Sequence, residues 1–406
     1  MPTTFAPTDV RRRNRDVVLR HIVSNEQSSR AGIAEETGLN QAAVWRITRE
    51  LVDAGLVVEG SPIEVKGQVG RRNIQLTLNN DGAYVVGIAL GGNARTIAIA
   101  NTSGQIIAQK RLRSVRLDNP YRVLGNVAKH VNELIERCGI DRSRLLGAGV
   151  AAAGQVDHKN GILIRSDTLG ENWSNIPVGQ ILSGQLGLPH RVESRPNALM
   201  LAELWNGQAV GVESAYLLNS SLGFGGSQFV NGELARPGEG HIERVLHHVV
   251  PGNDRRCYCG RKGCLEAVAS GWWIIDQVGD LVSDAGSRAF ASGEDKGAQL
   301  IALTELAASG NRKIRNAFKE AGRRLGFAVA SVLTLTNPQA VILAGIVGRQ
   351  SDYFDGVVET LQELHCDRED FPLHVSGVTS DDAAVWLGLD EFVYSRNLDI
   401  ERLRVA

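Results

Sequence analysis

Three of the five cysteines in this chain lie close together, in a segment rich in glycine and cations. Cys257 and Cys259 are separated by one residue, and the sequence Gly-Arg-Lys-Gly at 260–263 leads to Cys264. Glycine permits the positive φ angles that a tight backbone return requires, so the three thiols can converge. Three thiolates and one imidazole hold Zn²⁺ in a closed tetrahedron that leaves no position for catalysis. We predict a structural zinc site, with unligated thiols or a redox-active pair as the alternatives.

A histidine is expected as the fourth zinc ligand, and three histidines lie within the 16 residues before Cys257. They are His241, His247 and His248. His241 stands farthest from Cys257 along the chain. We favour His247, while His241 and His248 stay open as alternatives.

Length and composition predict a globular protein of several domains. The chain has 406 residues, of which 43% are hydrophobic and 22% are charged. The formal net charge is -1, so a surface for nucleic acid must come from local clustering of cations. No apolar run approaches the roughly 18 residues of a membrane span, and the N-terminus lacks the apolar core of a signal peptide. Cys138 and Cys366 suggest no disulfide framework, and we expect a cytoplasmic protein without a membrane partner.

Helical patterns near the N-terminus favour a DNA-binding motif. Apolar residues recur at helical spacing over 16–23. Ser29 is suited to cap a helix over 30–37, and Asn40 is suited to cap another over 41–54. Two short helices joined by a tight turn form a helix-turn-helix.

The second helix of this motif has an apolar face and a face left to point elsewhere. The apolar face consists of Val44, Ile47, Leu51 and Val52. The other residues are Gln41, Ala42, Trp45, Arg46 and Arg49. The second helix of a helix-turn-helix enters the major groove with its N-terminal residues at the base edges. We therefore expect this second set to contact DNA, with the first four of them at the bases.

A β-hairpin pattern at 55–59 and 73–78 predicts a wing after the two helices. Its glycine-rich tip contains the cations Lys66, Arg71 and Arg72. A basic cluster at 10–15, which includes Arg11, Arg12 and Arg13, is expected to form an arm before the first helix. Cations on the wing and the arm would contact phosphates or the minor groove, with salt-sensitive and sequence-independent affinity. A plain three-helix interaction module is the alternative.

Beyond a linker at 79–82, two halves of the chain repeat a pattern of strands, glycine turns and helices. Buried-strand patterns occur at 83–90, 145–154, 214–219 and 337–345, and helical patterns at 121–138, 198–206 and 321–335. This order predicts two α/β lobes around a cleft. Glycine turns after strands can cradle phosphates, because backbone N–H groups converge there. Here they indicate an ancestral nucleotide cleft rather than present use of a nucleotide.

Together these motifs resemble the ROK family of sugar-responsive repressors and sugar kinases. The resemblance rests on Cys257-Tyr-Cys259-Gly-Arg-Lys-Gly-Cys264-Leu-Glu266, Gly147-Ala-Gly-Val-Ala-Ala-Ala-Gly154-Gln-Val-Asp157, Gly223-Phe-Gly-Gly226 and Asn337-Pro338. The winged N-terminal domain resembles that of the family's glucose and xylose repressors, and the family's kinases lack it. The resemblance implies an actin-like two-lobe fold, a structural zinc, homodimers or homotetramers, and operator binding controlled by a sugar.

The fold class that we expect is α/β, with a winged helix-turn-helix followed by an actin-like two-lobe domain. The winged domain would span 1–80, the first lobe 83–195, and the second lobe with its zinc site 196–382. A C-terminal helix over 383–406 is expected to return to the first lobe.

Two departures from the family's kinases predict that this chain is not an enzyme. The kinases carry an Asp in an early strand-turn, where this sequence has Ala89. They carry a catalytic Asp in an Asn-Asp-Ala-Asn motif, where this sequence reads Ser194-Arg195-Pro196-Asn197. An arginine stays protonated and cannot accept a proton from a sugar hydroxyl. Arg195 could be a solvated loop cation, or it could bind an acidic or phosphorylated ligand through its guanidinium fork.

The resemblance also implies the effector site. Asn197 and Glu266 match family residues that contact sugar, while a helix cap or a surface carboxylate is the plainer role for each. Glu243 and His247 belong to a stretch that matches the family's Glu-x-Gly-His imperfectly. With Arg195, these four residues form the expected effector site.

We therefore expect a DNA-binding transcriptional regulator, a repressor of carbohydrate-use genes. A sugar or sugar derivative bound between the lobes would control it. The alternatives are an ATP-dependent sugar kinase with an added DNA-binding domain, and a repressor controlled by a protein partner.

Overall fold

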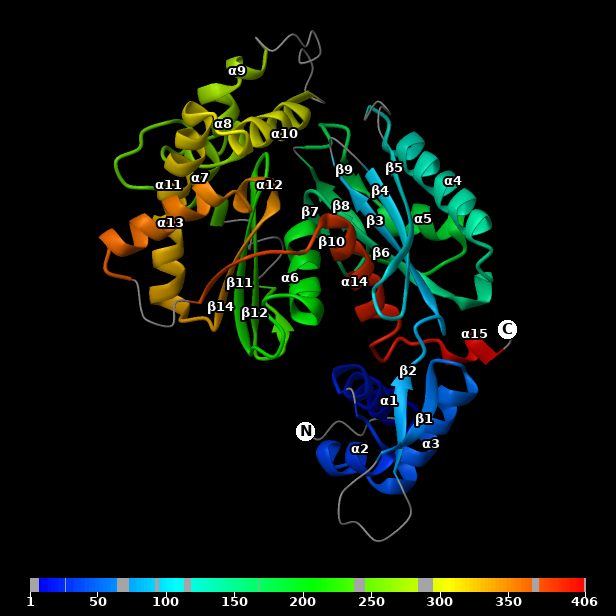
Figure 1. Ribbon diagram of the computed structural model, residues 1–406. Coiled ribbons are helices and arrows are strands. Elements are labelled where there is room, and N and C mark those ends of the chain that lie inside the picture. Colours follow the sequence, from blue (N-terminus) through cyan, green and yellow to red (C-terminus); the bar gives the residue numbers. More distant parts are fainter. Residues whose placement is uncertain are drawn as a thin grey trace.

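The computed structural model describes most of the chain as three packed units (Figure 1). The described residues are 7–25, 27–63, 73–91, 95–112, 118–166, 168–236, 245–283, 295–366 and 372–404. A small N-terminal domain lies below two lobes, each built around its own five-stranded sheet. Among the described residues, no helix combines the length and the apolar character that crossing a membrane demands.

The N-terminal domain is a winged helix-turn-helix. Its elements are α1 (Pro7–Ser24), α2 (Arg30–Thr37), α3 (Gln41–Asp53), β1 (Val57–Ile63) and β2 (Asn73–Leu78), the last two paired antiparallel. Both predicted caps are confirmed, because the Ser29 side chain accepts from the Gly32 N–H and the Asn40 side chain from the Ala43 N–H. Each cap satisfies a backbone donor that a helix start leaves unpaired. The expected arm before the first helix is wrong, since residues 10–15 lie inside α1.

The first lobe is a mixed sheet with strand order β10-β6-β3-β4-β5. Its strands are β3 (Tyr84–Leu90), β4 (Arg95–Asn101), β5 (Ile106–Leu112), β6 (Leu145–Ala152) and β10 (His190–Ser194). Strands β3, β6 and β10 run parallel, while β3, β4 and β5 form antiparallel hairpins. A small sheet of β7 (Gln155–Asp157), β8 (Ile162–Arg165) and β9 (Ser174–Ile176) extends this lobe.

Helices cover both faces of the first sheet. Side chains along its strands point alternately to the two faces, and each face contributes its buried residues to a different core. Val86, Ile88 and Val150 join the core that contains α4 (Pro120–Cys138) and α5 (Val178–Leu186). Val85, Leu146 and Ala151 join the core that contains α14 (Ser380–Phe392). The C-terminal segment is not the single helix expected over 383–406, since α14 ends at Phe392 and a separate α15 (Ile400–Arg404) follows.

The second lobe has the sheet order β13-β12-β11-β14-β15. Its strands are β11 (Ser214–Ser220), β12 (Phe224–Val230), β13 (Glu233–Leu234), β14 (Ala340–Ala344) and β15 (Leu373–Val375). Leu218, Val341 and Leu343 pack towards the long α11 (Arg312–Thr336) and α13 (Ser351–Glu363). The remaining helices on this side are α7 (Leu265–Val268), α8 (Gly271–Val278), α9 (Asp280–Ser283), α10 (Asp295–Ala308) and α12 (Gly345–Gly348).

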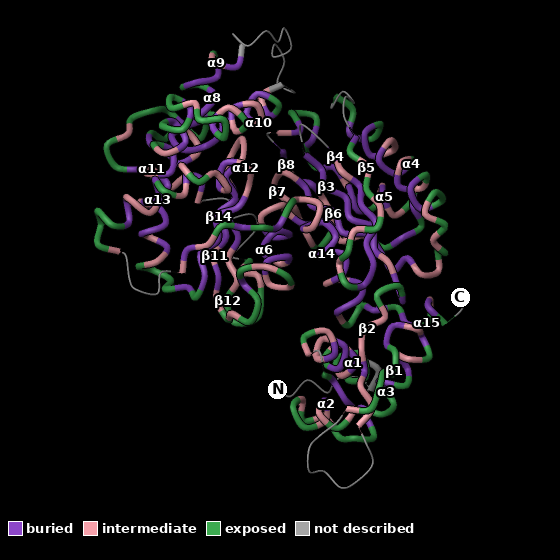
Figure 2. The backbone as a smooth tube through the Cα atoms, in the orientation of Figure 1, coloured by how far each residue is buried: buried purple, intermediate pink, exposed green. Residues whose placement is uncertain are grey.

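Two helices fill the layer between the sheets. The opposite face of the second sheet, with Leu217 and Ile342, shares its core with α6 (Arg195–Asn206) and α14. These two helices lie side by side between the lobes, and the strands on either side of them are the buried centres of the two sheets (Figures 1 and 2). The order across the molecule is therefore helices, sheet, α14 with α6, sheet, helices.

Glycines in the first sheet permit α14 to approach closely. A Cβ at Gly149 would stand 2.2 Å from the carbonyl oxygen of Ala384, and one at Gly147 would stand 2.4 Å from the ring of Phe392. Gly87 meets Val385 in the same way, at 2.8 Å. Because none of these neighbours is a flexible chain end, a side chain there would push the helix off the sheet.

Gly149→Ala is therefore expected to lower the free energy of unfolding by about 2 kcal/mol or more, as overpacking against rigid neighbours does. Gly184→Ala on α5 is the matched control, because nothing lies within 4 Å of its added Cβ. Because position 184 is exposed and helical, alanine there should raise the free energy of unfolding of this control by up to about 1 kcal/mol. Urea unfolding of both variants makes the comparison, and equal midpoints would show that α14 is not packed this closely.

Candidate DNA interface, ligand cleft and metal cluster

The third helix presents one exposed face to solvent. Gln41, Ala42, Trp45, Arg46 and Arg49 are all exposed, as the sequence predicts, and Trp45 exposes 49% of its surface. Val44, Ile47 and Leu51 on the opposite face are buried. The Arg49 guanidinium lies 5.4 Å from the Trp45 ring centroid, and Arg46 Nε donates only a long 3.4 Å bond to the Ala42 carbonyl. These side chains are available to a partner.

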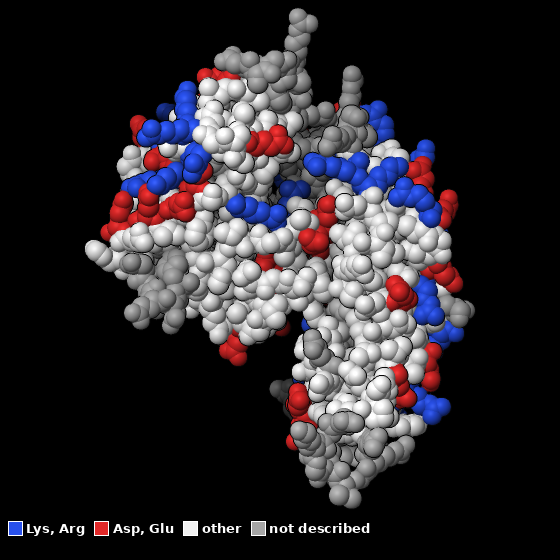
Figure 3. All heavy atoms as spheres, in the orientation of Figure 1, with Lys and Arg blue, Asp and Glu red and all other residues white. Residues whose placement is uncertain are grey.

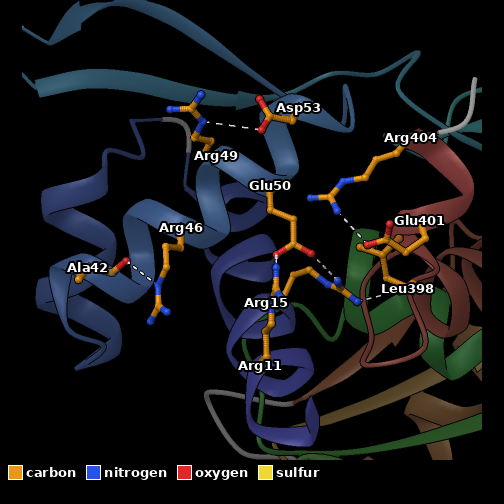
Figure 4. A network of polar contacts seen from close by, with 10 residues as sticks. All are labelled: Arg11, Arg15, Ala42, Arg46, Arg49, Glu50, Asp53, Leu398, Glu401 and Arg404. Atoms are coloured by element: carbon orange, nitrogen blue, oxygen red, sulfur yellow. Dashed lines mark hydrogen bonds and ion pairs between the residues drawn. The ribbon is translucent and has the colours of Figure 1, made fainter. Parts of the chain in front are cut away.

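The arginines of α1 do not all face outward. Arg11, Arg12 and Arg13 are exposed, but Arg11 Nη2 lies 2.8 Å from Glu50 Oε2 on α3. Arg15 is 5% exposed and its Nη1 donates to Glu50 Oε1 at 3.0 Å. Glu50 therefore lies between two arginines of α1 (Figure 4). Arg71 and Arg72 of the wing lie outside the described residues.

A cleft of about 1300 Å³ opens between the lobes. It brings together four of the five predicted effector residues, and the fifth, Glu243, lies outside the described residues. The four are Arg195, Asn197, Glu266 and His247. The cations Arg111, Lys159, Arg165 and Arg236 also line the cleft, and blue side chains gather around the hollow between the lobes in Figure 3.

A buried carboxylate that the sequence analysis missed organises one wall of this cleft. Glu193, 1% exposed at the end of β10, accepts from the Ser194 N–H at 2.9 Å and from Asn197 Nδ2 at 3.0 Å. Arg236 Nη2 lies 2.7 Å from its other oxygen, and Ser227 Oγ donates to Asn197 Oδ1 at 2.7 Å. The sequence held one signal, an acidic residue within a buried strand. Asn197 is therefore held by hydrogen bonds to one strand of each lobe, to Glu193 of β10 and to Ser227 of β12.

Arg195 is the first residue of α6 rather than a loop cation. Its Nη2 donates to the Leu90 carbonyl at the end of β3, at 3.1 Å, and its buried Nε has no partner among the described residues. Burial lowers the pKa of Arg195, and the charge of Asp381 opposes that shift. The guanidinium therefore occupies the end of β3, next to Ala89, which also lines the cleft and carries no carboxylate.

Glu266 faces the same cleft from the opposite lobe. Its Oε2 accepts at 2.8 Å from the N–H of Phe224, the first residue of β12, directly after the turn that contains Gly223. A Cβ on Gly223 would stand 2.7 Å from Glu266 Oε1, so glycine makes room for the carboxylate. Glu266 is thus held against the turn and directed to the cleft.

The predicted metal ligands form one compact cluster. The ligand atoms of His247, Cys257, Cys259 and Cys264 all lie within 4.8 Å of one another. The Gly260 and Gly263 φ angles of 87° and 73° make the turn, and a Cβ at Gly263 would meet the Asn253 carbonyl at 2.6 Å. His241 lies outside the described residues, and His248 is not part of the cluster.

The three thiols of the cluster differ in how readily they ionise. Burial chiefly raises the pKa of Cys264 to about 12, whereas a backbone hydrogen bond from Arg261 chiefly lowers the pKa of Cys259 to about 7. Without a cation the three thiols therefore cannot all ionise near neutrality. Coordination by a divalent metal deprotonates thiols outright, so this donor set fits a metal ion.

The metal cluster also forms part of the cleft wall. His247 and Tyr258 both line the cleft, with ring centroids 5.4 Å apart. Cys264 directly precedes Leu265, whose N–H donates to the His248 carbonyl at 2.9 Å, and Glu266 is the next residue. A metal at this cluster would therefore position Glu266.

Comparison with known proteins identifies the two parts of the chain. A winged helix-turn-helix DNA-binding model matches residues 16–58. The ROK family model matches residues 85–389, three-quarters of the chain. The chain belongs to the ROK family.

Its relatives within the ROK family include both repressors and kinases. The xylose repressor of Caldicellulosiruptor bescii is 27% identical over 353 residues, covering 86% of this chain and 86% of that protein. The glucokinase of Halalkalibacterium halodurans is 25% identical, covering 66% of this chain and 82% of that protein. A crystal structure of a ROK transcriptional regulator, a homologue of the Escherichia coli MLC protein, has a TM-score of 0.78 at 24% identity. It covers 98% of this chain and 100% of that one, which shows the same fold throughout.

Alanine substitutions of His247 and of His248, one at a time, should identify the fourth metal ligand in this ROK protein. His247→Ala is expected to lower bound metal well below about one equivalent per chain, because a four-ligand site loses a donor. His248→Ala, at the adjacent position, should leave metal content unchanged. Cys259→Ser should lose metal and Cys138→Ser, which lies far from the cluster in sequence, should retain it. Metal analysis of purified protein measures all four, and retention of metal in His247→Ala would exclude that residue as a ligand.

Proposed function

We propose that this ROK protein is a DNA-binding repressor of carbohydrate-use genes, controlled by a sugar or sugar derivative in the cleft. One observation carries the proposal: a winged helix-turn-helix with a free recognition face is joined to a ROK domain whose cleft has an arginine at the end of β3. The first part serves DNA recognition, while the second retains a ligand cleft in which Arg195 stands at the place of the kinases' catalytic aspartate.

The exposed face of α3 suits the major groove. Gln41, Ala42, Trp45 and Arg46 occupy the N-terminal half of α3, which meets base edges in helix-turn-helix proteins. Arg46 would make a bidentate contact to guanine, and Trp45 would offer apolar surface to a thymine methyl group. Arg49, the exposed Arg12 and Arg13 of α1, and the wing residues Arg71 and Arg72 would bind phosphates. Arg11 has less capacity for this, since Glu50 already pairs with it.

The effector would lie between Arg195 and Asn197 on one side and Glu266 and His247 on the other. Hydroxyl groups of a sugar suit Glu266, while a carboxylate or phosphate group of a derivative suits the Arg195 guanidinium. Glu243 belongs to the same proposal. The xylose and N-acetylglucosamine repressors among the relatives support a carbohydrate ligand, and their similarity extends over more than four-fifths of this chain.

The metal cluster would hold Zn²⁺ in a structural role. Three thiolates and an imidazole are the ligand set of closed tetrahedral zinc sites. When bound, the ion would supply folding free energy and fix the turn that carries Glu266, without taking part in a reaction. Assembly as a homodimer or homotetramer is proposed on the family resemblance.

The kinase alternative is disfavoured by the chemistry of the cleft. A sugar kinase needs a base for the hydroxyl proton and carboxylates that support Mg²⁺ and phosphate. The Glu193 carboxylate already pairs with Arg236 and accepts hydrogen bonds from Asn197 and from a backbone N–H, which makes it a poor base for a sugar hydroxyl. Arg195 fills the end of β3, where its guanidinium can take no proton.

Arg46→Ala should weaken binding to the specific operator by about 1–3 kcal/mol if Arg46 contacts guanine. The fold should be unaffected, because this side chain is exposed. Gel shifts at one fixed salt concentration, against the operator and a scrambled duplex, make the measurement. Arg122→Ala on α4, which replaces another exposed arginine in the first lobe, is the control. Identical affinities for Arg46→Ala and the wild type would refute the docking of α3.

No ATP-dependent phosphorylation of glucose, N-acetylglucosamine, mannose or xylose is expected above background. Loss of a general base alone removes a factor of about 10²–10⁴ from the rate. Coupled ADP release measures turnover, and Arg195→Ala serves as the control for a contaminating kinase. Turnover that disappears in that control would overturn the proposal of a regulator without enzymatic activity.

A further inference from the structure

Two helices connect the ligand cleft with the DNA-binding domain. Helix α6 begins at Arg195 and α14 begins at Ser380, and both residues line the cleft, as does Asp381. The helices have 12 and 13 residues, a length of roughly 18–20 Å at 1.5 Å per residue. They pack on each other between the sheets, and the far end of α14 approaches the N-terminal domain (Figure 1).

One carboxylate joins the far ends of both helices to α1. Asp390 Oδ1, near the end of α14, accepts from Trp205 Nε1 of α6 at 3.0 Å and from Arg20 Nη2 of α1 at 3.3 Å. The Arg20 guanidinium also lies 4.7 Å from the Trp205 ring centroid. The rings of Trp386 and Tyr394 also pack against the Trp205 ring, with ring centroids 5.9 and 4.8 Å from it. Trp205, Asp390 and Arg20 are called the junction below.

A second contact continues from α1 to the recognition helix. The buried Arg15 donates through Nη2 to the Leu398 carbonyl at 2.8 Å and through Nη1 to Glu50 Oε1 at 3.0 Å. Glu50 lies on the inner face of α3 and is 5% exposed (Figure 4). Removing one partner of such a pair leaves an uncompensated buried charge, so α1 and α3 are held together and to the C-terminal segment.

The apolar packing follows the same route. A single continuous core contains Leu19 of α1, Leu51 of α3, Leu398 after α14, Ala384 of α14 and Met200 of α6. The N-terminal domain is therefore docked on the α6–α14 layer through buried surface as well as through polar contacts. Packed elements of this kind respond by shifting as units, because close packing resists continuous deformation.

We propose that α6 and α14 carry a change in the cleft to the recognition helix, with Trp205, Asp390 and Arg20 as positioning residues. The proposal rests on the proposed function, since it supplies the physical link between ligand and DNA. A ligand that contacts Arg195 or Asp381 differently in two arrangements shifts the cleft ends of both helices. Their far ends hold α1 at the junction, and Arg15 and Glu50 transfer the shift to α3.

A double-mutant cycle tests this link without knowledge of the ligand. Asp381→Asn changes the cleft end, and Arg20→Ala combined with Asp390→Ala cuts the junction. The probe is a duplex that the wild-type protein selects from a random pool, used at one salt concentration. Asp381→Asn is expected to change the Kd for this duplex about fivefold or more in the wild-type background, within the range of allosteric coupling. In the cut background the change should fall below about twofold, because the cleft then has no path to α3, and this departure from additivity measures the coupling.

Arg122→Ala provides the matched control background. Arg122 pairs with Asp118 at 2.7 Å, and both side chains are 57% exposed, so an ion pair is lost far from the junction. The effect of Asp381→Asn should persist fully in this background. If the double variant unfolds, Arg20→Ala alone replaces it, since that side chain is 41% exposed. An equal effect of Asp381→Asn in all backgrounds, or none in the wild type, overturns the proposal.

Hydrogen exchange of the DNA-free protein separates this proposal from the proposed function. Asp381→Asn should change amide exchange in α1 and α3, and the junction variant should abolish that change while α4 is unaffected. A change confined to the cleft overturns the link between cleft and recognition helix. Failure of the wild-type protein to select any duplex would count against the DNA-binding function instead, and the exchange experiment would still decide the link.

Discussion

The close packing of α14 on the first sheet determines where both functional surfaces lie. Gly87, Gly147 and Gly149 let the helix backbone approach the strands to distances that any side chain would prevent. This contact returns the C-terminal segment to the middle of the molecule, where the start of α14 becomes a wall of the cleft. Its end meets α1, so the same helix also seats the DNA-binding domain.

Buried ion pairs favour this one arrangement of the helices and strands over alternative packings. Glu50 with Arg15, and Glu193 with Arg236, are buried or half-buried pairs whose members come from different elements. Such pairs are costly to desolvate and add little net stability, but they penalise any arrangement that separates the partners. The pair of Glu50 and Arg15 therefore fixes α3, and the pair of Glu193 and Arg236 fixes one wall of the cleft.

The cleft keeps the architecture of a sugar kinase while its chemistry differs. The backbone turns remain, and Asn197 and Glu266 are held by specific hydrogen bonds. Arg195 instead places a permanent cation at the end of β3. A cation there is compatible with binding a polar ligand and incompatible with proton abstraction. The Arg195 side chain therefore cannot serve as the base that phosphorylation of a sugar hydroxyl requires.

The sequence by itself predicted the features that depend on local chemistry. The capping residues Ser29 and Asn40, the exposed face of α3 and the two-lobe α/β order follow from hydrogen bonding and periodicity over a few residues, and the structure agrees. The clustering of Cys257, Cys259 and Cys264 follows equally from their spacing and from the glycines between them.

Only the tertiary structure decided which charged residues are available to a ligand and which are held by partners within the fold. Arg11 and Arg15 look alike in a basic cluster and both pair with Glu50, yet only Arg15 is buried, and it also donates to the Leu398 carbonyl, 383 positions away. Asp390 and Trp205 gave no local signal of their roles, and Glu193 gave only its position in a buried strand, because their partners come from other elements. Local sequence patterns carry information about neighbours along the chain, whereas these contacts depend on how α6, α14 and α1 pack in space.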